Sequence, residues 1–309
     1  MSANPIFIGG FRSGTTLLIN LLGMHSNLAP WFETKSLCEA LRWMHVIKNP
    51  ANKNFENNYT TPAEATGFSQ EAVRQRMLGH IEHTFARING AKPSGKAHHE
   101  KYPIGFDCIR YSKETACAAL TDWAKTTSVK SDYDTVCHAT RHLITTLGEK
   151  QCQAFNRPVW INKTPEIVRF SKELRDAMGP CKIIYLVRNG LNVVASARKL
   201  GWGNIESLAF NWKTLFEYTR DAMRDDSGNY LELRYEDLIS NPQDTLDKVF
   251  AFCGQRLDGE GIVKSYRQHF SNNAFNLSRI ETTGNLSPED IIKFNAIAGK
   301  LQTELGYTS

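Results

Sequence analysis

A glycine-rich loop between an apolar run and a helix-like stretch is the feature that most restricts the fold of this chain. Residues 9–16 read Gly-Gly-Phe-Arg-Ser-Gly-Thr-Thr, after an apolar run at residues 5–9 and before a helical pattern at residues 15–24. A strand, a glycine loop and a helix in this order are typical of sites where backbone N–H groups surround an anion at the helix N-terminus. We therefore predict an anion-binding loop here and not a simple glycine turn.

The details of this loop argue against ordinary nucleoside triphosphate chemistry. Gly9 and Gly14 have G-x-x-x-x-G spacing, but Thr15 stands where triphosphatases have lysine. In those enzymes another core strand ends in an Asp that helps to hold magnesium, whereas here the run at residues 181–187 is followed by Arg188. The loop also lacks the G-x-G-x-x-G spacing of dinucleotide folds. We expect a site of cations and hydroxyls, without a metal.

The apolar runs and the patterns between them predict an α/β fold. Strand-like runs occupy residues 5–9, 28–32, 158–161, 181–187 and 230–233. Helical patterns follow most of them, at residues 15–24, 165–178, 191–200 and 242–252. This alternation is typical of a parallel sheet. We predict a P-loop-type parallel sheet flanked by helices, in a single domain over residues 1–309.

A large part of the chain interrupts this alternation. Residues 37–155 contain no clear strand-like run, but they carry helical patches at residues 70–88 and 114–126, separated by a polar loop at residues 89–103. We predict a helical insertion that covers one side of the site. Its histidine pairs, such as His138 and His142, are interpreted as exposed residues and not as metal ligands.

A second candidate site follows the run at residues 181–187. Arg188 stands at its end, and Ser196 lies eight residues later within the next helical pattern. Because ligands of α/β proteins bind at the carboxyl ends of the strands, both side chains are placed to reach one phosphate. Arginine offers a two-pronged guanidinium and serine one hydroxyl.

Composition excludes several classes of protein. The chain has 309 residues, with 37 Lys and Arg against 32 Asp and Glu, a net charge of +5. No apolar run approaches the roughly 20 residues of a membrane span, and the N-terminus lacks a signal-peptide pattern. The mild charge does not indicate nucleic-acid binding. The seven cysteines include no C-x-x-C pair, which favours reduced thiols and a cytoplasmic protein.

Taken together, these motifs resemble those of the sulfotransferases that use 3′-phosphoadenosine-5′-phosphosulfate (PAPS). The loop at residues 12–17 resembles their 5′-phosphosulfate loop, and Arg188 with Ser196 resembles their 3′-phosphate motif. Tyr235-Glu236-Asp237-Leu238 and a tail ending Leu305-Gly306-Tyr307 resemble further family segments. The match leaves most of the insertion uncovered.

The resemblance implies a role for each matched residue. Glu33, followed by Thr34 as in the tyrosylprotein-type and related bacterial enzymes, would be the catalytic base, with Arg12 and Lys163 as catalytic cations. The nucleotide would be bound by Arg12, Ser13, Gly14, Thr15, Thr16, Leu17, Arg188, Ser196 and Tyr235. The string Lys163-Thr164-Pro165 lacks the catalytic histidine of many small-molecule enzymes. Arg198 is the nearest substitute for a second basic residue, and residues 280–283 give no clear match to a C-terminal catalytic serine.

The implied reaction moves a sulfuryl group from PAPS to an acceptor hydroxyl. The acceptor, whether peptide tyrosine, carbohydrate or small molecule, is not encoded in a readable motif, nor is the oligomeric state. Two other classes stay open from the residues alone: a magnesium-dependent P-loop kinase or nucleotidase, and a non-catalytic nucleotide-binding protein.

Overall fold

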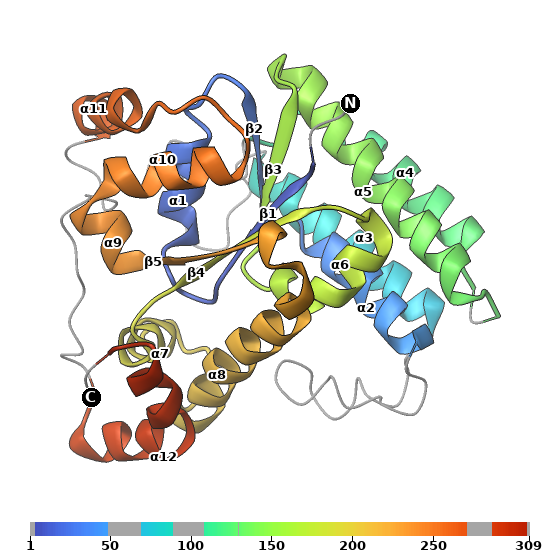
Figure 1. Ribbon diagram of the computed structural model, residues 1–309. Helices are drawn as coiled ribbons and strands as arrows, with labels where there is room; N and C mark the ends of the chain where they lie inside the picture. Colours follow the sequence, from blue (N-terminus) through green and yellow to red (C-terminus); the bar gives the residue numbers. More distant parts are fainter. Residues whose placement is uncertain (1–3, 49–68, 89–107, 129, 271–285, 308–309) are drawn as a thin grey trace.

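A five-stranded sheet in the order β2-β3-β1-β4-β5 forms the centre of the protein, and all of its neighbouring strands are parallel (Figure 1). The computed structural model describes residues 4–48, 69–88, 108–128, 130–270 and 286–307. The strands are β1 (Ile6–Gly9), β2 (Leu28–Phe32), β3 (Val159–Lys163), β4 (Lys182–Val187) and β5 (Tyr230–Arg234). All five predicted strands are present, so the expected α/β class with a parallel sheet is confirmed.

Side chains alternate between two apolar layers along each strand, as the period of two in a strand requires. Ile6 and Ile8 of β1 point into one layer, and Phe7 between them points into the other. The first layer is covered by α1 (Thr15–Leu22), α9 (Tyr235–Ser240), α10 (Pro242–Phe252) and α11 (Gly259–Phe270). Because both faces are buried along β1, β2 and most of β4, these strands read as continuous apolar runs.

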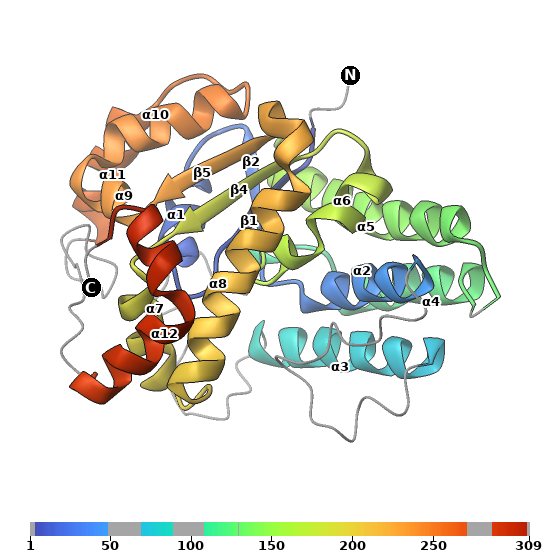
Figure 2. The same ribbon diagram turned by 60° about the horizontal axis from the view of Figure 1, so that its bottom comes forward.

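The second layer is covered by more helices. They are the 3-10 helix η4 (Ile167–Phe170) with α6 (Ser171–Met178), α7 (Gly190–Arg198), α8 (Ile205–Ala222) and α12 (Pro288–Glu304). A second 3-10 helix, η5 (Arg224–Asn229), precedes β5 and has no buried residue. The predicted helix at residues 165–178 is thus two elements, η4 and α6. Both views show α12 beside α7 and α8 (Figures 1 and 2).

The described part of the insertion contributes four helices to this second layer: α2 (Lys35–Lys48), α3 (Gln70–Ile88), α4 (Lys113–Thr126) and α5 (Tyr133–Phe155). α5 lies against β2 and β3, α2 packs on α5, and α3 and α4 lie outside them (Figure 2). Trp31 and Trp160 of the sheet belong to the same apolar cluster as Trp43 of α2 and Trp123 of α4. The helical character of the described part of the insertion is as predicted, while the polar loop at residues 89–103 lies outside the described residues.

Local sequence signals explain where several helices begin and end. Asp132 caps α5, since its side chain accepts a hydrogen bond from the Thr135 N–H at 2.7 Å. Asn156 ends the same helix in the left-handed conformation, with φ 52°. Within the described residues, no helix combines the length and apolarity needed to cross a bilayer.

Candidate active site

The carboxyl ends of all five strands carry predicted site residues. Because the sheet is fully parallel, these ends share one edge. Lys163 is the last residue of β3, and the other four strands are followed by the segments that hold Arg12, Glu33, Arg188 and Tyr235. The fold thus brings distant residues to one edge of the sheet: Arg12 and Tyr235, for example, are 223 positions apart in the chain.

Glycine is required in the loop after β1 for two different reasons. Gly14 caps α1 with φ 88°, and a Cβ there would lie 2.4 Å from the ring of Tyr235. Gly10 has φ 126°, and a Cβ there would lie 2.2 Å from the Leu186 carbonyl oxygen. The first glycine lets the buried ring of Tyr235 close on the loop, and the second lets the loop cross β4.

The remaining loop residues differ in what they leave available to a ligand. The Ser13 hydroxyl donates to the Phe11 carbonyl at 3.0 Å, so it is engaged within the loop. Leu17 is buried in the core, and its N–H donates to the Gly14 carbonyl at 2.9 Å. Thr15 is also buried. The Thr16 hydroxyl lies 3.3 Å from Nζ of Lys163, and this contact links the loop to β3.

The two loops that carry the predicted phosphate-binding arginines are in contact. Nε and Nη2 of Arg12 donate to the Ser196 hydroxyl on α7 at 3.3 and 3.1 Å. Arg188 is buried, and its Nη1 lies 3.4 Å from the Arg12 carbonyl oxygen. The Arg188 guanidinium also lies over the Tyr235 ring, 4.5 Å from its centroid. Arg12, Arg188, Ser196 and Tyr235 therefore form one cluster.

Trp202 lies at the rim of this cluster. Its side chain is half exposed, and the Arg12 guanidinium lies 5.2 Å from the centroid of its ring. Gly201 and Gly203 on either side have φ values of 74° and 153°. The tryptophans of the apolar cluster described above are buried. Trp202 lies outside that cluster and presents an aromatic surface beside the site.

Glu33 and Lys163 form an ion pair between the ends of β2 and β3. Nζ of Lys163 lies 2.6 Å from Oε1 of Glu33, and 3.6 Å from the centroid of the Phe32 ring. The Lys163 side chain is fully buried, whereas 24% of the Glu33 side chain is exposed. Burial lowers the pKa of Lys163, while the charge of Glu33 acts in the opposite direction.

A buried polar network fixes the turn that carries Glu33. Glu33 adopts φ 43°, a left-handed conformation that costs a non-glycine residue on the order of 1 kcal/mol. Next to it, Asn162 donates to the Thr34 hydroxyl at 2.7 Å, and the Thr34 N–H donates to the Thr164 hydroxyl at 3.0 Å. Hydrogen bonds of this kind contribute about 0.5–1.5 kcal/mol each and hold the turn. From the sequence, Thr34 and Thr164 were noted only as neighbours of Glu33 and Lys163, and Asn162 was not identified, although a polar residue next to Lys163 in an otherwise apolar strand was a usable signal.

Two further sequence predictions have a clear position. Arg198, the candidate for a second basic residue, forms an ion pair with Asp290 of α12 at 2.5 Å. His138 and His142 are exposed on α5, as interpreted from the sequence. Within the described part of the chain, no group of three His, Cys, Asp or Glu side chains is arranged to hold a metal ion.

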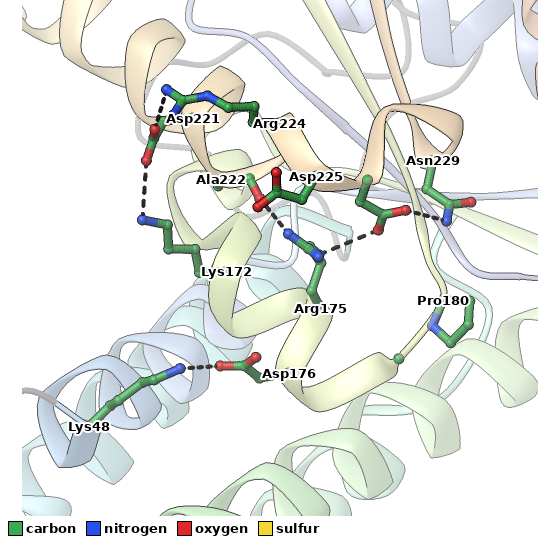
Figure 3. Close-up of a pocket in the computed structure, with 12 residues that line it drawn as sticks. Lys48, Lys172, Arg175, Asp176, Pro180, Asp221, Ala222, Arg224, Asp225 and Asn229 are labelled. Carbon is green, nitrogen blue, oxygen red and sulfur yellow. Dashed lines mark hydrogen bonds and ion pairs between the residues drawn. The ribbon is translucent and has the colours of Figure 1, made fainter.

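A polar pocket of about 710 Å³ lies elsewhere, at the amino ends of β4 and β5 (Figure 3). Its cations are balanced by acidic neighbours: Lys172 pairs with Asp221 at 3.3 Å, and Arg175 with Asp226 at 3.4 Å. Because the pocket's lining carries four cationic and four acidic residues, it offers no net attraction for an anionic ligand. The phosphate-binding candidates at the opposite edge of the sheet remain the stronger site.

Comparison with known proteins gives one family. The sequence matches the model of the family described as "Sulfotransferase family" over residues 5–259. No curated protein matches the chain.

Solved structures with a similar fold include three sulfotransferase structures. The sulfotransferase domain of the olefin synthase of Synechococcus PCC 7002 is 18% identical, with a TM-score of 0.53 over 100% of this chain and 96% of that one. The sulfotransferase domain of the curacin biosynthetic pathway is 15% identical, with a TM-score of 0.53 over 100% and 99%. Sulfotransferase STF9 of Mycobacterium avium is 13% identical, with a TM-score of 0.53 over 100% and 78%. At such identities the likeness concerns the fold alone.

Proposed function

This chain belongs to the sulfotransferase family, and we propose that it transfers the sulfuryl group of PAPS to an acceptor hydroxyl, with Glu33 as the base. The observation that carries the proposal is the gathering of one ion pair and two arginines at the carboxyl edge of the sheet. The pair Glu33–Lys163 has the short separation of 2.6 Å. Arg12 and Arg188 meet through the Arg12 carbonyl, at 3.4 Å.

The residues fit an anionic nucleotide. The loop at residues 9–16 ends at Gly14, which caps the N-terminus of α1 in the left-handed conformation. The N–H groups and the dipole of a helix N-terminus favour a phosphate at this position. Arg188 is buried and would bind the 3′-phosphate together with the Ser196 hydroxyl. Arg12 and Arg188 carry like charges on two loops in contact, so an anion bound between their guanidinium groups would stabilise the site. We propose PAPS as that anion and no metal.

The chemistry proposed for the site follows from charge. When bound, PAPS supplies the sulfuryl group, which passes in line to the acceptor oxygen while the bond to the 5′-phosphate breaks. Glu33 takes the proton of the acceptor hydroxyl, and its ion pair with Lys163 holds the carboxylate in place beforehand. Lys163 and Arg12 stabilise the negative charge that develops on the leaving phosphate oxygen. The backbone N–H groups of the loop orient the 5′-phosphate.

The acceptor enters, in this proposal, from the side where Glu33 remains partly exposed. The insertion helices α2 and α3 and the half-exposed Trp202 would form its walls. An aromatic ring beside Arg12 suits an acceptor with a flat apolar part next to its hydroxyl.

Two measurements test the proposal. Calorimetry in EDTA should detect binding of adenosine 3′,5′-bisphosphate, and radiolabelled PAPS should transfer its label to a hydroxyl compound from a panel of phenols, sugars and tyrosyl peptides. Tight binding of ATP that requires magnesium, without binding of the bisphosphate, would favour the kinase or nucleotidase alternative. Binding of the bisphosphate without transfer to any acceptor would favour a non-catalytic nucleotide-binding protein.

A further inference from the structure

Two side chains from distant parts of the chain hold the turn that follows β4. The Asn189 N–H donates to Oε1 of Glu236 at 3.1 Å, and the Gly190 N–H donates to Oε1 of Gln302 at 2.9 Å. Glu236 lies on α9, and Gln302 lies near the end of α12. The turn carries Arg188, so its position depends on both helices.

These contacts also decide how an anion can be recognised there. The next two N–H groups of α7 donate to the side chain of Asn189, at 3.0 and 3.3 Å. The first N–H groups of the helix are therefore already bound to protein acceptors, and the helix end is not open to a phosphate in the usual way. Recognition of an anion then falls to the side chains of Arg188, in the turn before α7, and of Ser196, farther along α7, so their placement matters more.

α12 packs directly on the start of α7. A Cβ at Gly190 would lie 2.6 Å from Cζ of Phe294 and 3.0 Å from Oε1 of Gln302. Gln302 is fully buried, and its Nε2 has no hydrogen-bond partner among the described residues. A buried amide with one unsatisfied group costs stability. The hydrogen bond from the Gly190 N–H to Gln302 is therefore the contact that explains why a glutamine occupies this apolar layer.

The other end of α7 is attached to the same helix. Arg198 pairs with Asp290, and Asp290 belongs to the capping box that begins α12. The start of α7 therefore meets the end of α12, and the end of α7 meets the start of α12. The two helices run antiparallel, and Ser196 lies between the two points of attachment.

Tyr307 completes the arrangement. Its buried hydroxyl donates to Oε2 of Glu236 at 2.8 Å, while Oε1 of the same carboxylate holds Asn189. The Arg234 guanidinium lies over its ring, 4.2 Å from the centroid. Tyr307 thus orients the carboxylate that orients the turn.

We propose that α12 and Tyr307 form a clamp that positions Arg188 and Ser196 for a 3′-phosphate, with Gln302 and Tyr307 as positioning residues. The inference rests on the proposed function, because it assigns the 3′-phosphate to this end of the site. The clamp lies beyond residue 259, where the family match ends, so it adds to the site a segment that the family model does not cover.

The test compares two nucleotides that differ only in the 3′-phosphate. Dissociation constants for adenosine 3′,5′-bisphosphate and for AMP are measured by calorimetry for the whole protein. Gln302→Leu should weaken the bisphosphate about tenfold, since a displaced arginine loses roughly the value of one charge-assisted hydrogen bond. AMP binding should stay within about twofold. Tyr307→Phe, which removes only a hydroxyl, should weaken the bisphosphate about threefold.

Thr303→Val is the matched control, because Thr303 lies next to Gln302 on the exposed side of α12. It should leave the ratio of the two constants unchanged. An unchanged ratio in both Gln302→Leu and Tyr307→Phe, even with a lower melting temperature, would reduce the clamp to a structural role and overturn the inference. If the wild-type protein itself does not prefer the bisphosphate, the proposed function fails first. If Gln302→Leu does not fold, Tyr307→Phe decides the question.

Discussion

Nζ of Lys163 lies 2.6 Å from Oε1 of Glu33, although the lysine is fully buried and the glutamate is partly exposed. The two side chains come from adjacent strand ends, because Phe32 of β2 is in register with Lys163 of β3. A buried lysine is tolerated only with compensating partners, and here they are Glu33, the Thr16 hydroxyl and the Phe32 ring. The pair therefore couples the proposed base to a proposed catalytic cation.

Glu33→Gln should reduce the rate of sulfuryl transfer by about 10²–10⁴-fold, the usual contribution of a general base. Glutamine keeps the volume but does not take a proton at neutral pH. Because the change also frees Lys163 from its ion pair, nucleotide affinity should stay the same or increase slightly. Single-turnover transfer and calorimetry with adenosine 3′,5′-bisphosphate separate the two effects.

Glu166→Gln is a suitable control for this experiment. Glu166 is a nearby carboxylate that interacts with Lys35 at 3.8 Å and electrostatically with Lys163. It should retain most of the wild-type rate. If Glu33→Gln keeps more than about a tenth of the rate, well short of a general-base loss, the base is another residue.

Lys163→Met should change how stability depends on pH. Burial lowers the pKa of Lys163 in the folded protein, while an unfolded lysine keeps its proton up to about pH 10.4. Between these two pKa values the unfolded state binds more protons, so the free energy of unfolding rises with pH in the wild type. Each unit of pKa difference corresponds to about 1.4 kcal/mol.

The readout is the difference in unfolding free energy between the wild type and Lys163→Met, from urea titrations between pH 7 and pH 10. Taking the difference removes the contribution of buried tyrosines, such as Tyr185, whose raised pKa has the opposite effect. The free energy of unfolding of the wild type should rise relative to that of Lys163→Met as the pH increases. A flat difference would mean that Lys163 titrates as an ordinary lysine.

Arg188→Ala should weaken binding of adenosine 3′,5′-bisphosphate about ten- to a hundredfold and affect AMP far less. The reason is the loss of a charge-assisted, two-pronged contact to the 3′-phosphate. Arg188→Lys keeps the charge but not the planar fork, so its affinity for the bisphosphate should lie between those of the wild type and Arg188→Ala. Equal losses for both nucleotides would assign Arg188 to the support of the loop, through its contact with the Arg12 carbonyl.

Gly14→Ala should destabilise the protein more than Gly201→Ala. Both glycines have positive φ, 88° and 74°, which costs alanine roughly 1–2 kcal/mol. A Cβ at Gly14 would also collide with Tyr235 at 2.4 Å, whereas a Cβ at Gly201 would have no neighbour within 4 Å. Thermal unfolding of the two variants isolates the collision, and equal melting temperatures would contradict the close packing of Tyr235 on the loop.

The sequence predicted the sheet well because most of its strand residues are buried and apolar, although β5 is only partly buried and contains Glu232 and Arg234. It did not identify α5 as a continuous helix, for a visible reason. The buried face of α5 includes Thr140, Gly148 and Gln151, and these residues blur the helical period. Gly148 is needed because a Cβ there would lie 2.4 Å from the Trp160 indole, a requirement that arises only once helix and sheet are packed together.

The candidate site was predictable to the extent that its residues follow strands. Arg12 and Arg188 could be found from their local motifs, and the structure places them together. Gln302 and Tyr307 could not be assigned contacts, because their partners at Gly190 and Glu236 are 112 and 71 positions away. Nothing in a short window of sequence links an amide in the last helix to a turn in the middle of the chain.

The left-handed backbone at Arg12, with φ 51°, sets selection for stability against selection for chemistry. Glycine or asparagine would adopt this conformation at lower cost than arginine. A library of this chain sorted only for resistance to heat should therefore enrich those two amino acids at position 12. At Glu33, with φ 43°, the same change would leave the buried Lys163 without its carboxylate, so glutamate should be retained there. The same library sorted for turnover should retain arginine at position 12, and directed evolution toward a more stable variant would tend to erase the activity at this position first.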